Sequence, residues 1–230
     1  MAQAEQLIIV STFELGGRTL ATVPCRCPAG AEIARRWRSL PAEAEGVTLA
    51  TLRSVPDPSW QAARAAITAF AAMPRGWLIL SGTYGTGKTR LLYAALNELA
   101  ARGRYGRYLT MPDLLDQLRD GITAGLYAER LDRVVEAPIL ALDELDKFRT
   151  DSDWAADVLE KLFIRRYREA RYTGTLLVYN RERADRLPAF LQSRIHDSHF
   201  RFVDLNGPDL RPLAAQLDPW DRGDGEARHG

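Results

Sequence analysis

The sequence predicts an α/β protein of three layers, in which helices cover both faces of a parallel sheet and a small N-terminal segment precedes the sheet. Short apolar runs alternate with longer helical segments, a glycine-rich loop follows the first core run, and polar residues follow two later runs. Strands that alternate with helices favour a parallel sheet, because each crossover helix returns the chain to the same edge. A chain of 230 residues can bury one such core and leave a small accessory segment.

Residues 1–55 differ from the rest of the chain in their pattern of apolar and turn residues, and they are expected to form the small N-terminal segment. Residues 7–13 and 20–23 are predicted to be short strands that a Gly-Gly turn separates. A helical stretch is predicted for residues 31–40. This segment is expected to serve for docking a partner.

Residues 56–217 are expected to form the core, and residues 218–230, rich in glycine and charge, a disordered tail. The linker at 55–59 contains two prolines, and Ser59 is expected to cap the helix that follows. Helices are assigned where apolar residues recur at helical spacing, and strands where apolar residues run continuously. The predicted helices span residues 60–72, 88–102, 111–119, 126–135 and 153–171. The predicted strands span residues 77–81, 107–110, 139–142 and 175–179.

The composition sets limits on partners and location. The formal net charge is +1, so no field of the whole protein attracts nucleic acid or a membrane, and any such contact must come from a local patch. No apolar run approaches the roughly 20 residues that span a bilayer. The run at 7–10 is too short for a signal-peptide core and has no basic residue before it. We therefore expect a cytoplasmic protein without membrane contact.

Cys25 and Cys27 are the only cysteines of the chain. One intervening residue is poor spacing for a disulfide, and a tetrahedral zinc site needs four ligands. Two interpretations remain open: a pair of reduced thiols in a turn between two prolines, or half of a zinc site completed by another chain or by histidine. The histidines of the chain lie far away in sequence.

The loop after the first core strand fits the pattern G-x-x-x-x-G-K-[ST] at every fixed position. Its glycines let successive backbone N–H groups point at phosphate oxygens, and the following helix adds its positive end. Lys88 is expected to reach the β- and γ-phosphates, and the Thr89 hydroxyl to bind Mg²⁺. The nucleotide-binding residues expected here are Gly82, Thr83, Tyr84, Gly85, Thr86, Gly87, Lys88, Thr89 and Arg90. The sequence therefore predicts a site for ATP with Mg²⁺.

Asp143 and Glu144 follow the apolar strand at 139–142. A carboxylate at the end of a parallel strand lies at the edge where the phosphate loop also opens, so Asp143 is expected to bind the nucleotide's Mg²⁺. Glu144 is placed to polarise the attacking water, because its carboxylate can accept a proton. The alternative is a strand that ends in a solvated acidic turn. Asp146 is expected to be a surface acid.

Asn180 and several arginines are further candidates for the site. Asn180 follows the last predicted strand and could hold a water near the γ-phosphate, although an asparagine there is usually turn chemistry. Arg194 could neutralise charge on a transferring phosphoryl group. Arg181 and Arg186 are rival candidates for that role, and the alternative for Arg194 is an ordinary surface salt bridge. Chemistry alone does not choose among them. Arg211 is a second candidate.

The order of these motifs resembles the AAA+ superfamily and, within it, the helicase loaders of the DnaC type and the related IstB transposition ATPases. The likeness covers roughly residues 55–215 and is carried by residues 71–92, 108–118, 138–148, 165–167, 177–180 and 191–211. The resemblance implies that Asn180 is the first sensor of the site. It also implies that Arg194 is an arginine finger donated to the neighbouring subunit, and that Arg211 is the second sensor.

The N-terminal segment departs from the pattern of this family. Loaders often carry a zinc knuckle with two cysteine pairs, and Cys25-Arg26-Cys27-Pro28 resembles only the second pair. Gly16-Gly17-Arg18 stands where the first pair might have been, so we expect a degenerate knuckle that folds without zinc. In the phosphate loop, Tyr84 replaces a small residue or proline.

The resemblance implies an ATPase that acts with a replicative helicase and single-stranded DNA, and that assembles as a homo-oligomer in which Arg194 completes a neighbour's site. Two alternatives stay open: an IstB-like helper that acts on a transposase and duplex DNA, and a nucleotide-dependent adaptor with little hydrolysis. The residues expected to meet DNA are Arg119, Tyr127, Arg130 and Arg133, or Lys161, Arg165 and Arg166. The same mixture also occurs on ordinary solvated helix faces.

Overall fold

The computed structural model describes residues 11–15, 18–23, 40–52, 55–147, 153–194, 197 and 199–211. The expected turn at 16–17, almost all of the helix expected at 31–40, both cysteines and the expected tail at 218–230 lie outside these residues.

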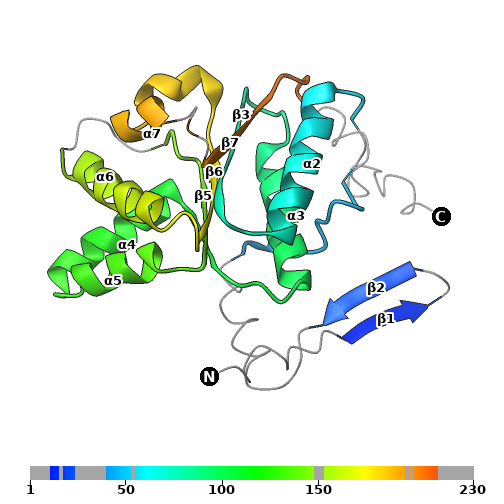
Figure 1. Cartoon of the computed structure of the whole chain (residues 1–230), viewed down its shortest axis with the longest axis horizontal. Coiled ribbons are helices and arrows are strands. Elements are labelled where there is room, and N and C mark those ends of the chain that lie inside the picture. The colour runs from blue at the N-terminus through cyan, green and yellow to red at the C-terminus, as the bar shows by residue number, and fades with distance from the viewer. Residues whose placement is uncertain are drawn as a thin grey trace, which may run out of the picture.

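Five parallel strands form the central sheet (Figure 1). In spatial order they are β4 (Arg107–Thr110), β5 (Ile139–Asp143), β6 (Gly174–Val178), β3 (Gly76–Gly82) and β7 (Phe200–Leu205). Because all five run the same way, their carboxyl ends meet at one edge of the sheet. The predicted α/β class and the parallel sheet are confirmed.

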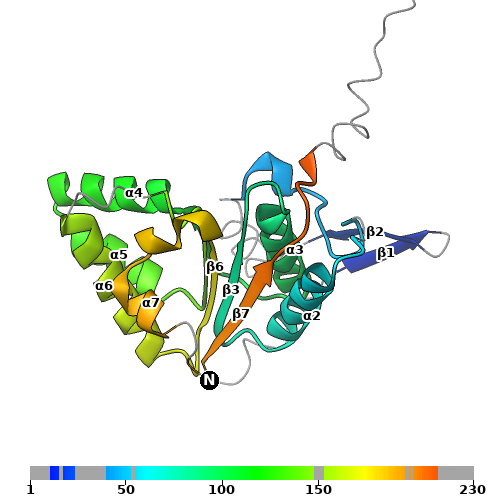
Figure 2. The same cartoon turned by 90° about the horizontal axis from the view of Figure 1, so that it is seen from above.

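Helices cover both faces of this sheet (Figures 1 and 2). One face carries α2 (Pro58–Ala72) and α3 (Lys88–Ala101), and the other carries α4 (Met111–Thr123), α5 (Tyr127–Val135), α6 (Asp153–Arg168) and α7 (Ala189–Arg194). Successive side chains of a strand point to opposite faces. Leu78 and Leu80 of β3 accordingly join the core under α2 and α3, whereas Trp77 and Ile79 join the core on the other side. Burial on both faces explains the continuous apolar runs.

The edge strand β7 is the one core strand that the sequence analysis missed. It pairs with β3 so that Val203 lies beside Leu80 and Leu205 beside Gly82. Val203 and Leu205 are buried, but Arg201 and Phe202 are exposed. An edge strand that is partly open to solvent has no continuous apolar run, so the pattern used for the other strands did not find it.

The predicted cap of α2 is wrong. Asp57 caps the helix, because its Oδ1 accepts the N–H of Trp60 at 3.1 Å. Pro58 occupies the first helical position, where proline is tolerated since that N–H has no partner within the helix. Ser59 lies inside the helix, and its hydroxyl accepts the N–H of Asn206 at 3.0 Å. Two further helix ends differ: α4 continues to Thr123, and α6 ends at Arg168.

Part of the expected N-terminal segment packs on the core. β1 (Ser11–Leu15) and β2 (Arg18–Val23) form an antiparallel pair, as the strand predictions require, with shifted bounds. Residues 40–52 contain a short 3-10 turn, η1 (Ala42–Ala44). The Asn97 amide of α3 donates to the carbonyls of Ala44 at 2.8 Å and Val47 at 2.7 Å.

Arg166 of α6 is fully buried, although it was expected in a basic surface cluster. Its guanidinium donates to the carbonyls of Val135 at 2.7 Å, Ala137 at 2.8 Å and Gly174 at 2.6 Å, and to Thr175 Oγ1 at 2.9 Å. Burial lowers the pKa of Arg166 to about 10, because a low-dielectric site disfavours the charged form. The cation therefore joins the end of α5 to the beginnings of β5 and β6.

The other members of that expected cluster differ from Arg166. Lys161 is exposed, and Arg165 forms an ion pair of 2.7 Å with Asp132 of α5. Within the described part of the chain, none of the helices combines the length and the hydropathy that a membrane span requires.

Replacement of Arg166 by methionine is expected to lower the free energy of unfolding by roughly 3 kcal/mol or more, because each buried carbonyl left without a donor costs about 1–3 kcal/mol. Urea denaturation measures the change. Arg168→Ala, on the exposed side of the same helix, is the control and should change stability by less than about 0.5 kcal/mol. Equal effects of the two changes would contradict a structural role of the buried guanidinium.

Candidate functional site

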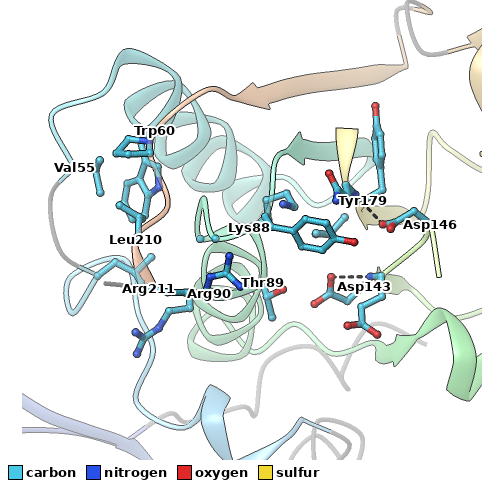
Figure 3. A pocket seen from close by; sticks show the side chains of 18 of the residues that line it. Val55, Trp60, Lys88, Thr89, Arg90, Asp143, Asp146, Tyr179, Leu210 and Arg211 are labelled. Atoms are coloured by element: carbon cyan, nitrogen blue, oxygen red, sulfur yellow. Dashed lines mark hydrogen bonds between the residues drawn. The ribbon is translucent and has the colours of Figure 1, made fainter. Parts of the chain in front are cut away.

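A cavity of about 700 Å³ opens at the carboxyl edge of the sheet (Figure 3). Its polar part is lined by the phosphate-loop motif and by residues that follow β5 and β6, including Lys88, Thr89, Asp143, Glu144, Asp146 and Asn180. Its apolar part is lined by Leu52, Val55, Pro56, Trp60, Pro208 and Leu210. The parallel sheet thus brings three separate segments of the sequence to one site.

The glycines of the loop allow close contacts that a side chain would block. Gly82, Gly85 and Gly87 all have positive φ, at 149°, 77° and 85°. A Cβ on Gly82 would lie 2.7 Å from the carbonyl oxygen of Leu205, which the pairing of β3 and β7 holds in place. The Gly85 carbonyl accepts the N–H of Leu210 at 2.9 Å, so the loop also contacts the last described segment.

Lys88 begins α3 and folds back over its own loop. Its Nζ donates to the carbonyls of Gly82 at 2.9 Å and Thr83 at 2.6 Å. Burial lowers the pKa of Lys88, and the charge of Asp143 opposes this shift. Gly87 precedes the helix and offers no side-chain cap, so the first N–H groups of α3 remain available to an anion.

Asp143 ends β5 and is almost completely buried. Its Oδ1 accepts the N–H of Glu144 at 2.8 Å, and the Thr89 hydroxyl also hydrogen-bonds its carboxylate. Burial raises the pKa of Asp143 and outweighs these hydrogen bonds and the nearby Lys88. A carboxylate and a hydroxyl in contact are two ligands of the kind that Mg²⁺ accepts.

Glu144 has a strained backbone and a paired side chain. Its φ of 56° is the only positive value among the described non-glycine residues. Such a conformation costs about 1–3 kcal/mol and is common at functional sites. The Glu144 carboxylate forms an ion pair with Lys147, which also lines the cavity and whose pKa this pairing raises.

Asp146 is not the surface acid that the sequence analysis expected. It is buried at the cavity, and its Oδ1 accepts the backbone N–H of Asn180 at 2.7 Å (Figure 3). The bond joins the segment after β5 to the end of β6. Sequence reasoning could not find this role, because the partner is a backbone group distant in sequence.

The Asn180 side chain has a defined orientation and a free donor. Its Oδ1 accepts the N–H of Glu182 at 3.1 Å, which fixes the amide, and its Nδ2 is buried without a partner among the described residues. A buried donor without an acceptor is costly. An oxygen of a bound ligand or of its attacking water would remove that cost, so the arrangement fits a phosphate ligand.

The arginines named by the sequence analysis lie in different places. Arg90 and Arg211 line the cavity, and Arg211 pairs with Asp209 at 2.6 Å. Arg194 does not line the cavity; it ends α7 and lies over the ring of Tyr167. Of its two rivals, Arg181 is bonded to Asp204 and Asn206, and Arg186 is exposed; both belong to the 3-10 segment η2 (Arg181–Arg186).

The apolar end of the cavity was missed by the sequence analysis. Trp60 lies there, and its Nε1 donates to the carbonyl of Thr86 at 3.2 Å, which ties α2 to the phosphate loop. Val55 and Leu210 complete this end, one from the linker and one from the last described segment. The sequence analysis placed Trp60 only at the start of a predicted helix, and the folded chain shows that it borders the cavity.

The described residues contain no group of three or more His, Cys, Asp or Glu that could hold a metal ion alone. A magnesium ion typically uses one or two protein ligands together with substrate phosphates. Thr89 and Asp143 match that kind of site.

A glycine-rich loop that opens a helix at the carboxyl edge of a parallel sheet, with an acidic strand end beside it, defines a P-loop nucleotide-binding protein. Comparisons with known proteins narrow this class. A family described as "IstB-like ATP binding protein" matches residues 66–177. The replicative helicase loader DnaC of Escherichia coli (strain K12) is 31% identical over 111 residues, 47% of this chain and 45% of that protein.

Two further comparisons give a second related sequence and a solved structure with a similar fold. An insertion sequence IS5376 putative ATP-binding protein from Geobacillus stearothermophilus is 31% identical over 93 residues, 40% of this chain and 37% of that one. A crystal structure of the DnaC helicase loader superposes with a TM-score of 0.63 at 23% identity, over 72% of this chain and 100% of that one.

Residues 66–177 of this chain therefore resemble the DnaC-type, IstB-like AAA+ ATPases, as the motifs indicated, and the superposition shows that the fold is the same. This assignment supports nucleotide binding and, in general terms, ATPase activity. The aligned stretches span less than half of the curated relatives, 45% and 37% of their lengths.

Gly82→Ala is expected to weaken binding of a fluorescent ATP analogue by about tenfold or more, equal to about 1.4 kcal/mol, because the added Cβ meets the Leu205 carbonyl. Gly125→Ala is the matched control: Gly125 also has positive φ, at 69°, but nothing lies within 4 Å of its Cβ position. The Gly125→Ala change carries the left-handed backbone cost of roughly 1–2 kcal/mol in stability and should leave nucleotide affinity unchanged. Equal affinities in the two variants would contradict the close approach.

Asp143→Asn is expected to raise the thermal unfolding midpoint at neutral pH. Burial raises the pKa of Asp143 above its usual 3.8, so the folded state holds this proton more tightly than the unfolded chain does. The ionised carboxylate therefore lowers stability as the pH rises from 3.8 through the folded pKa, and asparagine removes this penalty. The gain, measured by calorimetry, should shrink as the pH is lowered. A variant less stable than the parent at neutral pH would contradict the sign.

Proposed function

We propose that this protein is an ATP-hydrolysing helicase loader that binds ATP with Mg²⁺ and acts in an assembly of like subunits on single-stranded DNA. The observation that carries the proposal is the free Asn180 Nδ2, buried in the same cavity as Lys88, Thr89 and Asp143. This arrangement suits a triphosphate, because the amide needs an acceptor, Lys88 is a cation, and Thr89 and Asp143 are ligands of the kind that Mg²⁺ accepts.

The residues of the cavity then have distinct tasks. Lys88 would exchange its two loop carbonyls for phosphate oxygens, and Thr89 and Asp143 would hold the metal. Bound Mg²⁺ would neutralise charge on the phosphates. The Glu144 carboxylate breaks its ion pair with Lys147 and then orients the attacking water. The Asn180 amide donates a hydrogen bond to that water or to the terminal phosphate. Arg90 and Arg211 supply further positive charge at the edge of the cavity.

Arg194 acts on a neighbouring subunit in this proposal. Its side chain is 44% exposed and lies outside the cavity of its own chain, so it can meet a nucleotide only across an interface. The site of a single subunit is then incomplete, and ATP turnover per subunit depends on protein concentration.

A replicative helicase is the proposed partner, since the E. coli relative is a replicative helicase loader. Arginines that the sequence analysis expected to contact DNA are engaged within the chain. Arg119 pairs with Asp116 at 2.8 Å, Arg133 pairs with Glu129, and Arg130 donates to the Gln117 carbonyl at 2.6 Å. DNA phosphates would have to replace these partners. Arg166 is buried and is removed from the candidates.

Two other functions have specific support. The family match and the insertion-sequence relative favour a transposition helper with a transposase as its partner. The ion pair between Glu144 and Lys147 favours a nucleotide-dependent adaptor with little hydrolysis, because it holds the carboxylate that would orient water.

Turnover of ATP per subunit, measured against protein concentration with and without single-stranded DNA, tests the proposal. We expect it to rise with concentration and with DNA, and to fall about 10³-fold in Arg194→Ala, the lower end of the usual effect of an arginine finger. Arg168→Ala, an exposed arginine on α6, controls for loss of charge.

Flat turnover that ignores DNA and survives Arg194→Ala would contradict the loader mechanism and leave the P-loop ATPase. Stimulation by duplex DNA and a transposase, but not by a helicase, would favour the transposition helper. Tight ATP binding without turnover at any concentration would favour the adaptor.

A further inference from the structure

We propose that Tyr167 is the positioning residue for Arg194: its hydroxyl and ring hold the guanidinium in the orientation in which it is offered to a neighbouring subunit. This inference rests on the proposed function, in which Arg194 completes a neighbour's site.

The contacts between the two side chains are of two kinds. The Arg194 guanidinium lies over the Tyr167 ring, with Cζ 4.8 Å from the ring centroid, and over Phe190 at 5.5 Å. Arg194 NH1 also donates to the Tyr167 hydroxyl at 3.1 Å. A planar guanidinium that is both stacked and hydrogen-bonded loses much of its freedom to rotate.

Asp197 gives the hydroxyl a direction. The Tyr167 hydroxyl donates its proton to Asp197 Oδ2 at 2.6 Å, so its oxygen is left as an acceptor for Arg194. The other carboxylate oxygen accepts the N–H of His199 at 3.0 Å and lies 2.9 Å from its Nδ1. The hydrogen bonds from Tyr167 and from His199 hold the pKa of Asp197 well below its usual value, so the acceptor stays ionised.

Aromatic side chains fix the ring of Tyr167 itself. Its centroid lies 5.7 Å from that of Phe190, 5.6 Å from His199 and 6.0 Å from Phe200. Phe200 in turn lies 4.9 Å from Trp77 of β3. Arg194 remains 44% exposed while its support is packed against the sheet, which is the arrangement expected of a charge presented to a partner.

The direct pairing of Arg194 with Asp197 is too long to fix the guanidinium by itself. The two charged groups are 3.8 Å apart, whereas the hydroxyl between them makes both short contacts. Tyr167→Phe therefore removes the bridge and keeps the ring, the stacking and the packing against Phe190 and Phe200. This change separates orientation of the finger from stability of the fold.

A mixing experiment tests the proposal. Glu144→Gln subunits, which keep Arg194 but lack the carboxylate that orients water, are mixed with Arg194→Ala subunits, which keep their own site but have no finger. Each is expected to be nearly inactive alone, and the mixture to regain turnover wherever a Glu144→Gln subunit donates its finger. Tyr167→Phe is then added to the donor or to the acceptor.

We expect the change in the donor to lower the regained turnover by about tenfold, since small misplacements of reacting groups cost factors of this size. The KM for ATP, set by the acceptor's own cavity, should stay the same. The same change in the acceptor has no finger to misplace and should leave the regained turnover intact. Tyr172→Phe in the donor is the matched control, because Tyr172 is 80% exposed in the turn that follows α6.

Equal losses from donor and acceptor would show a merely structural role and overturn the inference, as would a donor change without effect. If the unmodified mixture regains no turnover, Arg194 is not donated between subunits, and the proposed function fails together with the inference. Regained turnover that is indifferent to Tyr167 in the donor overturns the inference alone.

Discussion

The geometry of the site depends on the hydrogen bonds that the buried Arg166 guanidinium donates to backbone carbonyls. Among the described residues this guanidinium has no carboxylate partner, and the carbonyls of Val135, Ala137 and Gly174 stabilise its charge. These carbonyls belong to segments that must lie together for β5 and β6 to pair. The far ends of the same two strands lead to Asp143 and Asn180. A buried cation at one edge of the sheet therefore helps to place the polar groups at the other edge.

The cavity also contains charged and polar groups that burial disfavours. Burial disfavours the charged forms of both Lys88 and Asp143, and the Asn180 Nδ2 has no acceptor among the described residues. Each of these costs would fall if phosphates and a divalent cation entered, because opposite charges would replace the water that folding removed. The burial of these polar groups is thus an electrostatic cost that a phosphate ligand with a divalent cation would lower, which is a physical source of affinity.

The sequence predicted the central strands and the phosphate loop well because their causes are local. Strands buried on both faces have continuous apolar runs, and Gly82 and Lys88 belong to a motif with fixed spacing. The failures had causes distant in sequence. β7 is half-exposed at the sheet edge, the burial of Asp146 is set by the backbone of Asn180, and Arg166 is stabilised by carbonyls of three other segments. The apolar end of the cavity likewise forms only when the linker and the last described segment meet.

The pairing of β3 with β7 connects the phosphate loop with the aromatic cluster that supports Arg194. Gly82 lies beside Leu205 at one end of the pair, and Trp77 lies beside Phe200 at the other. The first end borders the phosphate loop, and the second supports the aromatic cluster under Arg194. The β3–β7 pair therefore gives the phosphate loop and the aromatic support of Arg194 one shared, hydrogen-bonded element.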